Sequence, residues 1–182
     1  MRAGPLPTLV VVSGPPASGK TTLAHALARA IPCPAVCRDE IKEGMVHVHG
    51  EGFEAASRDP LTVRTLPVFF EVVRVLVAAG VTVVAEAAFR DRVWRQGLEP
   101  LLGLVELRIV QCDVGDAVAR ERLARLRPAH GDRSPAAVDA LAGGRPFPDF
   151  ERLSIPAPSL AVDTTEGYVP ELGEIVAFVN RR

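Results

Sequence analysis

The sequence predicts an α/β protein in which a parallel sheet is covered by helices on both faces. Short runs rich in valine and leucine alternate with longer segments whose apolar residues recur every three or four positions. This alternation indicates strands joined by helical crossovers, which produce a parallel sheet. Residues 1–182 contain no internal repeat and no domain linker, so we expect one domain.

The expected strands are Thr8–Ser13, Ala35–Cys37, Val81–Ala85, Leu104–Cys112 and Leu160–Val162. The expected helices are Lys20–Ile31, Asp39–His47, Leu61–Ala79, Asp91–Leu102, Asp116–Leu126, Ala136–Leu141 and Pro170–Val179. Thr8–Ser13 is almost wholly apolar, as in a central strand buried on both faces. Pro67 falls inside one helical pattern and predicts a kink or a break there.

A phosphate-binding loop is the strongest motif, since residues 14–21 match the pattern GxxxxGK[ST] in full between a strand and a helix. Its glycines allow backbone N–H groups to turn toward phosphates, and the helix N-terminus adds a partial positive charge. Lys20 is expected to reach the β- and γ-phosphates as a catalytic residue, and the Thr21 hydroxyl to bind Mg²⁺. We therefore expect ATP and Mg²⁺ as cofactors. The expected nucleotide-binding residues are Gly14, Pro15, Pro16, Ala17, Ser18, Gly19, Lys20, Thr21 and Thr22.

Asp39 directly follows the second expected strand and can face the γ-phosphate across the cleft. There it could take the proton of an attacking hydroxyl, as a catalytic base that also contacts the substrate. The same position equally suits a residue that only caps the helix that follows. Lys42 lies about one turn further along and could hold the acceptor or the transferring phosphoryl group, or be a surface lysine.

Glu86 follows the apolar run of the third strand. An acidic residue at this place can hold Mg²⁺ or orient the substrate, and we expect one of these two roles. Pairing with Arg90 or Arg92 is the structural alternative.

An arginine-rich segment around residues 120–142 predicts a lid over the phosphates, with Arg122 and Arg125 as its catalytic residues. Arginine forks stabilise a moving phosphoryl group, and a lid excludes water while delivering them. A solvated helix face is the alternative for any single arginine of the segment.

The composition indicates which classes of binding partner and which cellular location to expect. The net charge of −1 gives no broad electrostatic reason to expect duplex nucleic acid, although a nucleic-acid 5′ end in a local basic pocket remains open. No apolar stretch is long enough for a membrane helix, so no membrane partner is expected. Cys33, Cys37 and Cys112 are an odd number without metal-like clustering, which predicts unpaired thiols and a cytoplasmic location.

With these motifs the chain resembles small P-loop kinases. The resemblance is to the kinase domain of polynucleotide kinases, chloramphenicol phosphotransferase, zeta toxins, gluconate and shikimate kinases and, above all, AAA-type kinases. It implies a nucleoside-monophosphate-kinase-like three-layer sandwich, a P-loop NTPase sheet of five parallel strands in the order 2-3-1-4-5. It also implies that Asp39 is the general base and that Lys42 contacts the acceptor side. Val162–Thr165 resembles the V-D-T-T of gluconate- and shikimate-type kinases, which implies that Asp163 and Thr164 line the base pocket.

The chain departs from these families in two places. Polynucleotide kinase has Asp where this chain has Glu86, and residues 47–66, expected to bind the acceptor, match none of the named enzymes.

We therefore predict an enzyme, a P-loop phosphotransferase that transfers the γ-phosphoryl group of ATP to a hydroxyl of a small molecule such as a metabolite or an antibiotic. The alternatives are a polynucleotide 5′-hydroxyl kinase and a nucleotide-dependent switch or binding module without kinase activity. A switch has no need of a base at Asp39, whereas a kinase does.

Overall fold

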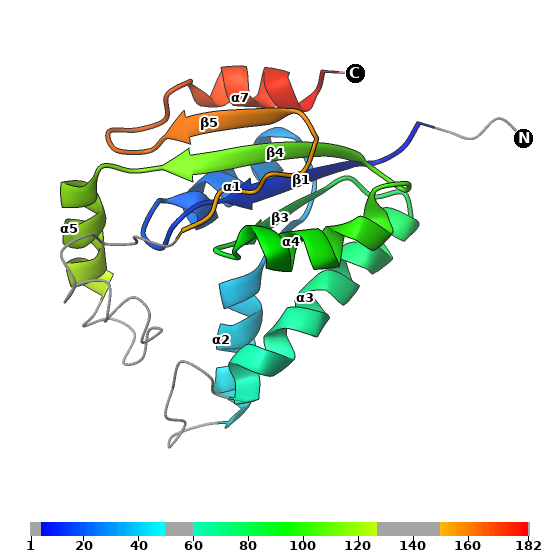
Figure 1. The fold of residues 1–182 in the computed structure, drawn as a ribbon, viewed down its shortest axis with the longest axis horizontal. Coiled ribbons are helices and arrows are strands. Elements are labelled where there is room, and N and C mark those ends of the chain that lie inside the picture. Colours follow the sequence, from blue (N-terminus) through cyan, green and yellow to red (C-terminus); the bar gives the residue numbers. More distant parts are fainter. Residues whose placement is uncertain (1–4, 50–59, 127–149, 182) are drawn as a thin grey trace, which may run out of the picture.

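The computed structural model describes residues 5–49, 60–126 and 150–181. The strands in these ranges form one five-stranded parallel sheet in the order β2-β3-β1-β4-β5 (Figure 1). The strands are β1 Thr8–Ser13, β2 Ala35–Cys37, β3 Val83–Ala87, β4 Glu106–Asp113 and β5 Ser159–Asp163. The predicted fold class and strand order are confirmed.

Helices cover both faces of this sheet. The described ranges contain α1 Lys20–Ala30, α2 Arg38–His49, α3 Pro60–Ala78, α4 Asp91–Leu98, the 3-10 turn η1 Glu99–Leu101, α5 Asp116–Leu126 and α7 Leu172–Val179. One core contains side chains of α1 and α7, and the other contains side chains of α3 and α4. Three layers result, as predicted.

The alternation of side chains along β1 explains why its sequence is so apolar. Leu9 and Val11 belong to the core under α3 and α4, whereas Val10 and Val12 belong to the core under α1 and α7. Successive strand residues point to opposite faces, and a central strand covered on both faces must therefore be apolar at every position.

The carboxyl ends of the strands form the edge of the sheet that carries the candidate site. In Figure 1 the arrowheads of β4 and β5 point toward the side where α5 lies. The loop after β1, the start of α2 after β2 and the end of β3 lie at this same edge, because all the strands run parallel. Ligands of such sheets bind there.

The third strand begins later than predicted, at Val83 instead of Val81. The N–H of Val81 donates to the carbonyl of Leu76 at 3.0 Å, so this residue completes the C-terminal turn of α3. Strand pairing starts at Val83, which lies opposite Leu9, and continues to Ala87. Glu86 is consequently inside the strand, not after it.

The helix bounds also decide two open points, whether Pro67 breaks its helix and whether Asp39 caps the next one. Pro67 neither ends nor splits α3, which is one helix from Pro60 to Ala78. Pro67 and Val63, whose carbonyl loses its helical partner, are both exposed, so water can solvate that carbonyl. Helix α2 begins at Arg38, so Asp39 is inside its first turn and not at the cap position.

Some predictions lie outside the described residues. These are the helix at 136–141, the acceptor segment at 50–59 and most of the predicted lid, of which only 120–126 is described. Within the described ranges, no helix combines the length and the apolar character needed to cross a membrane. The three cysteines are free thiols; Cys37 and Cys112 are buried and Cys33 is partly exposed.

Candidate active site

The phosphate-binding loop joins β1 to α1 in a conformation that needs small residues. Ala17 and Gly19 both have positive φ values, 61° and 72°. A Cβ atom on Gly14 would lie 2.7 Å from the carbonyl oxygen of Cys112, which forbids any larger residue there. The Ser18 hydroxyl is buried and has no hydrogen-bond partner among the described residues, which leaves it available to a ligand.

At the start of α1, Lys20 and Thr21 both contact the carboxylate of Glu86. Lys20 Nζ lies 3.6 Å from Glu86 Oε1, and the Thr21 hydroxyl donates to Glu86 Oε2 at 3.0 Å. The side chains of Lys20 and Glu86 are only 8% and 1% exposed, so the pair is shielded from solvent. A carboxylate beside a hydroxyl offers the hard oxygen donors that Mg²⁺ prefers, and this donor set fits that ion.

Burial and a neighbouring acid act on Glu86. Burial raises the pKa of Glu86 above its ordinary value, and the charge of Lys20 lowers this pKa in part. The charge of Asp39 raises the pKa of Glu86 further, so the two carboxylates share one electrostatic environment. A cation placed between them would favour the charged form of both.

Asp39 reaches this environment from the second strand. Cys37, the last residue of β2, lies opposite Glu86 in the sheet register, and the chain then passes directly into α2. The side chain of Asp39 is 60% exposed and accepts a hydrogen bond from Arg38 Nη1 at 2.7 Å. Lys42 follows on the same helix and is partly exposed. The structure thus brings the charge of Asp39 close enough to act on Glu86, with Lys42 further along α2.

Arg122 and Thr164 hold the other side of the loop. Arg122 Nη2 donates to the carbonyls of Thr164 and Thr165 at 2.6 and 3.2 Å. Arg122 Nη1 lies 3.4 Å from the carbonyl oxygen of Ala17. The buried Thr164 hydroxyl donates to the carbonyl of Ser18 at 2.6 Å, so residues after β5 are bonded directly to the phosphate loop.

Asp163 does not face the loop in the same way. Its Oδ1 accepts a hydrogen bond from the backbone N–H of Thr165 at 2.7 Å, and the side chain of Thr165, together with this N–H, lowers the pKa of Asp163. Its side chain closes the turn that presents Thr164.

Arg125 lies apart from these contacts. It forms an ion pair with Glu121 at 2.6 Å on the solvent side of α5, and its side chain is 77% exposed. The structure therefore places Arg122 at the phosphate loop and Arg125 away from it. The roles of both arginines in catalysis stay predictions.

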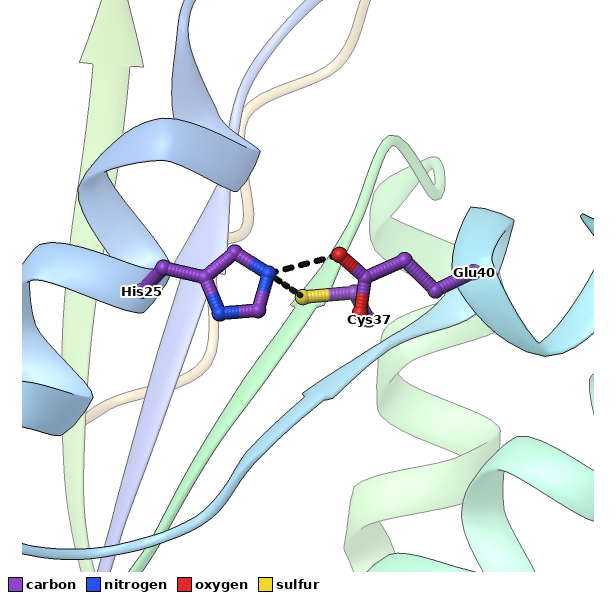
Figure 2. A group of neighbouring side chains, drawn as sticks. All are labelled: His25, Cys37 and Glu40. Atoms are coloured by element: carbon purple, nitrogen blue, oxygen red, sulfur yellow. Dashed lines mark hydrogen bonds and ion pairs between the residues drawn. The ribbon is translucent and has the colours of Figure 1, made fainter.

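Sequence reasoning missed one group of side chains near the site. His25 of α1, Cys37 of β2 and Glu40 of α2 meet where β2 passes into α2 (Figure 2). They come from three expected elements and follow no short motif, so only knowledge of the strand order could have brought them together.

A comparison with protein-family models identifies the family. The model of AAA_33, described as an AAA domain, matches residues 9–145, which include the phosphate loop, Asp39, Glu86 and Arg122. The chain belongs to the AAA_33 family. This is a family of P-loop kinases, and the phosphate loop of this chain is intact. The protein therefore has a kinase-type fold and binds a nucleotide.

Solved structures share the fold over nearly the whole chain. A suspected kinase from Chloroflexus aurantiacus is 27% identical with a TM-score of 0.77, and the match covers 97% of this chain and 96% of that one. A sugar kinase from Janibacter is 18% identical (TM-score 0.67), covering 96% and 95%. The APS kinase CysC of Mycobacterium tuberculosis, in complex with AMPPNP and APS, is 16% identical (TM-score 0.62), covering 98% and 100%. No curated protein matches the chain.

Proposed function

We propose that the protein is an ATP- and Mg²⁺-dependent kinase that transfers the γ-phosphoryl group to a hydroxyl of a small molecule. One observation carries the proposal: Lys20, Thr21 and Glu86 form a connected, largely buried group at the phosphate loop, and the charge of Asp39 acts on it from the facing helix. A phosphate cradle with a carboxylate facing it provides both halves of a phosphoryl transfer.

The nucleotide side of the reaction uses the loop and its supports. Backbone N–H groups of residues 14–19, the free Ser18 hydroxyl and Lys20 would bind the phosphates. Thr21 and Glu86 would hold Mg²⁺, which when bound neutralises charge on the phosphate oxygens. Thr164 would line the base pocket from the segment that it already bonds to the loop.

On the acceptor side, Asp39 would accept the proton of the attacking hydroxyl. Its carboxylate is exposed toward solvent, so an acceptor can reach it, and Arg38 Nη1 holds one of its oxygens at 2.7 Å. Arg122 would stabilise charge on the phosphoryl group as it moves, from its position beside Ala17. Lys42 would contact the acceptor from the same helix as Asp39.

Shared folds support a small-molecule acceptor. The sugar kinase and the APS kinase keep this fold at nearly equal length, and both are named for small substrates. The near-neutral charge of the chain, and its aromatic content of only 5%, offer little for tracking along a nucleic-acid strand. We therefore place a small-molecule hydroxyl before a polynucleotide 5′-hydroxyl.

The test measures ADP release with Mg²⁺ and ATP against a panel of hydroxyl acceptors: sugars, nucleosides, aminoglycosides, chloramphenicol and 5′-hydroxyl oligonucleotides. Acceptor-dependent ADP release is expected with a member of the small-molecule group. Asp39→Asn should keep the affinity for ATP and lower the transfer rate by roughly 10²- to 10⁴-fold. Glu43→Gln, which neutralises an exposed acid one turn further along α2, is the matched control and should keep the wild-type rate.

Each result separates the alternatives. Transfer only to 5′-hydroxyl oligonucleotides would replace the small-molecule acceptor with a nucleic acid. ATP binding without turnover on any acceptor would favour the switch. An Asp39→Asn enzyme that transfers phosphate at the wild-type rate would remove Asp39 as the base.

A further inference from the structure

The side chains of His25, Cys37 and Glu40 converge next to the candidate active site, and Figure 2 shows them pointing toward one another from α1, β2 and α2. His25 Nε2 lies 2.6 Å from Glu40 Oε1 and 3.8 Å from Cys37 Sγ. Each residue offers one ligand atom, and all these atoms lie within 4.8 Å of one another. One imidazole nitrogen, one thiol sulfur and one carboxylate oxygen thus lie close enough to bind the same ion.

We propose that His25, Cys37 and Glu40 bind a divalent transition-metal ion, with Zn²⁺ as the best match. Zinc takes nitrogen, sulfur and oxygen ligands together, and three protein ligands leave a fourth position for water or another small ligand. With metal–ligand distances of about 2.0 to 2.3 Å, tetrahedral angles place the ligand atoms roughly 3.3 to 3.6 Å apart. The observed separation of His25 and Cys37 is close to this range.

The contact between His25 and Glu40 would open by about 0.7 Å to reach the tetrahedral spacing. Their side chains are 39% and 48% exposed, so both have room to move apart. Cys37 is buried at the end of its strand and fixes the position of the sulfur ligand. Adjustment of these side chains would bring the three ligand atoms, which already lie within 4.8 Å of one another, to the spacing of a tetrahedral site.

This site differs chemically from the one proposed for Mg²⁺. Mg²⁺ prefers oxygen ligands and would select Thr21 and Glu86, whereas a thiolate with an imidazole selects zinc. Burial and the carboxylates of Glu86 and Glu40 raise the pKa of the Cys37 thiol, so Cys37 carries its proton until a metal binds. The incoming cation displaces this proton to solvent and binds the thiolate.

The location gives a bound ion a structural consequence. Cys37 lies opposite Glu86 in the sheet, and Glu40 is adjacent to Asp39 in the first turn of α2. An ion held by all three ligands would tie α1 to the start of α2 and fix the helix that carries Asp39. The binding proposal itself does not depend on the kinase proposal, because it is tested without nucleotide or turnover.

The experiment titrates the reduced full-length protein with Co²⁺ as a spectroscopic probe, then with Zn²⁺, without nucleotide and in excess Mg²⁺. One equivalent of Co²⁺ should give a thiolate-to-cobalt charge-transfer band, and Zn²⁺ should abolish it by displacing the cobalt. His25→Ala and Cys37→Ser should each lose this band and weaken Zn²⁺ binding at least about 10-fold. Cys33→Ser and His47→Ala, the matched controls outside the cluster, should bind as the wild type does.

His25→Ala keeps the test decisive if Cys37→Ser fails to fold, because His25 is partly exposed and outside the buried cores. Zn²⁺ should also raise the melting temperature of the wild type and of both controls, but not that of His25→Ala. A wild-type protein without a thiolate band would overturn the proposal and leave only an imidazole–carboxylate hydrogen bond. A band that survives in His25→Ala, or disappears in Cys33→Ser, would overturn it as well.

Discussion

The two sides of the candidate site are held in different ways. On the nucleotide side, the phosphate loop is bonded to distant parts of the chain: Thr164 donates to Ser18, Arg122 contacts Ala17, and Lys20 pairs with Glu86 in the interior. On the proposed acceptor side, Asp39 is largely exposed on the first turn of α2.

This difference indicates which half of the proposed function the fold itself fixes. Phosphate groups are the same in every nucleotide, so a loop that binds them can be prepared before the ligand arrives, by bonds that reach across the sheet. An acceptor differs from enzyme to enzyme, and its contacts come from exposed helices and connections that can change without disturbing the cores. The nucleotide side can therefore be recognised from the chain, and the acceptor cannot.

The largest effect is expected from Lys20→Ala. Loss of this cation removes charge stabilisation from the β- and γ-phosphates and leaves the buried Glu86 without its cationic partner. Acceptor-dependent turnover should fall by about 10³-fold or to background, with weaker ATP binding by calorimetry. Arg29→Ala, an exposed cation later in the same helix, is the control. If Lys20→Ala keeps its turnover, the phosphate loop with Lys20 is not the site of phosphoryl transfer.

Glu86→Gln should give the next largest effect and show which side Glu86 serves. Glutamine keeps nearly the same shape but loses the charge beside Thr21, and we expect turnover to fall by about 10²-fold. If Glu86 holds the metal, raising the Mg²⁺ concentration should restore part of the rate while the KM for the acceptor stays constant. A raised acceptor KM without any change in Mg²⁺ dependence would place Glu86 on the acceptor side instead.

Arg122→Ala and Arg125→Ala compare a bonded arginine with a solvent-exposed one on the same helix. Arg122→Ala should lower kcat by about 10- to 100-fold, because Arg122 lies at the phosphate loop, and should change ATP affinity less. Arg125→Ala should have a smaller effect, since its partner is the exposed Glu121. Equal losses in both variants would show that Arg125 also reaches the phosphates, and unchanged kcat in both would remove the lid role.

Asp91→Asn should affect stability and leave the rate unchanged. Asp91 accepts hydrogen bonds from the Ser154 backbone and from Arg95, and these bonds lower its pKa below the ordinary value of 3.8. A carboxyl whose pKa is lowered by folding stabilises the protein above pH 3.8, and this contribution is lost as the pH falls through the folded-state pKa.

Asp91→Asn should therefore lower the free energy of unfolding at pH 7 by about 1 to 2 kcal/mol, measured by urea unfolding. The difference from the wild type should narrow below pH 3.8. Glu151→Gln, at an exposed residue, is the control. If the turnover rate of Asp91→Asn falls together with its free energy of unfolding, turnover depends on overall stability. The rate losses of the site variants could then not be assigned to the nucleotide side or the acceptor side.

Much of the site could be predicted because its residues follow the ends of strands. The loop at 14–21 is contiguous in sequence, and Asp39 and Glu86 lie near the ends of apolar runs whose parallel pairing brings them to one edge. The exact start of β3 could not be predicted, because Val81 is as apolar as Val83 and only the end of α3 decides which of them pairs. The sequence also could not show that Arg122 contacts the phosphate loop while Arg125 faces solvent, since both are arginines on one short helix.

By itself, the sequence determined the fold class, the strand order through its family resemblance, and the phosphate loop, because these depend on local patterns of apolar residues and on a contiguous motif. Only the tertiary structure decided that Glu86 contacts both Lys20 and Thr21 and that Arg122 contacts the phosphate loop. It also decided that the side chains of His25, Cys37 and Glu40 lie next to one another. Such contacts depend on side-chain direction and on distances between elements far apart in the chain, which no local pattern specifies.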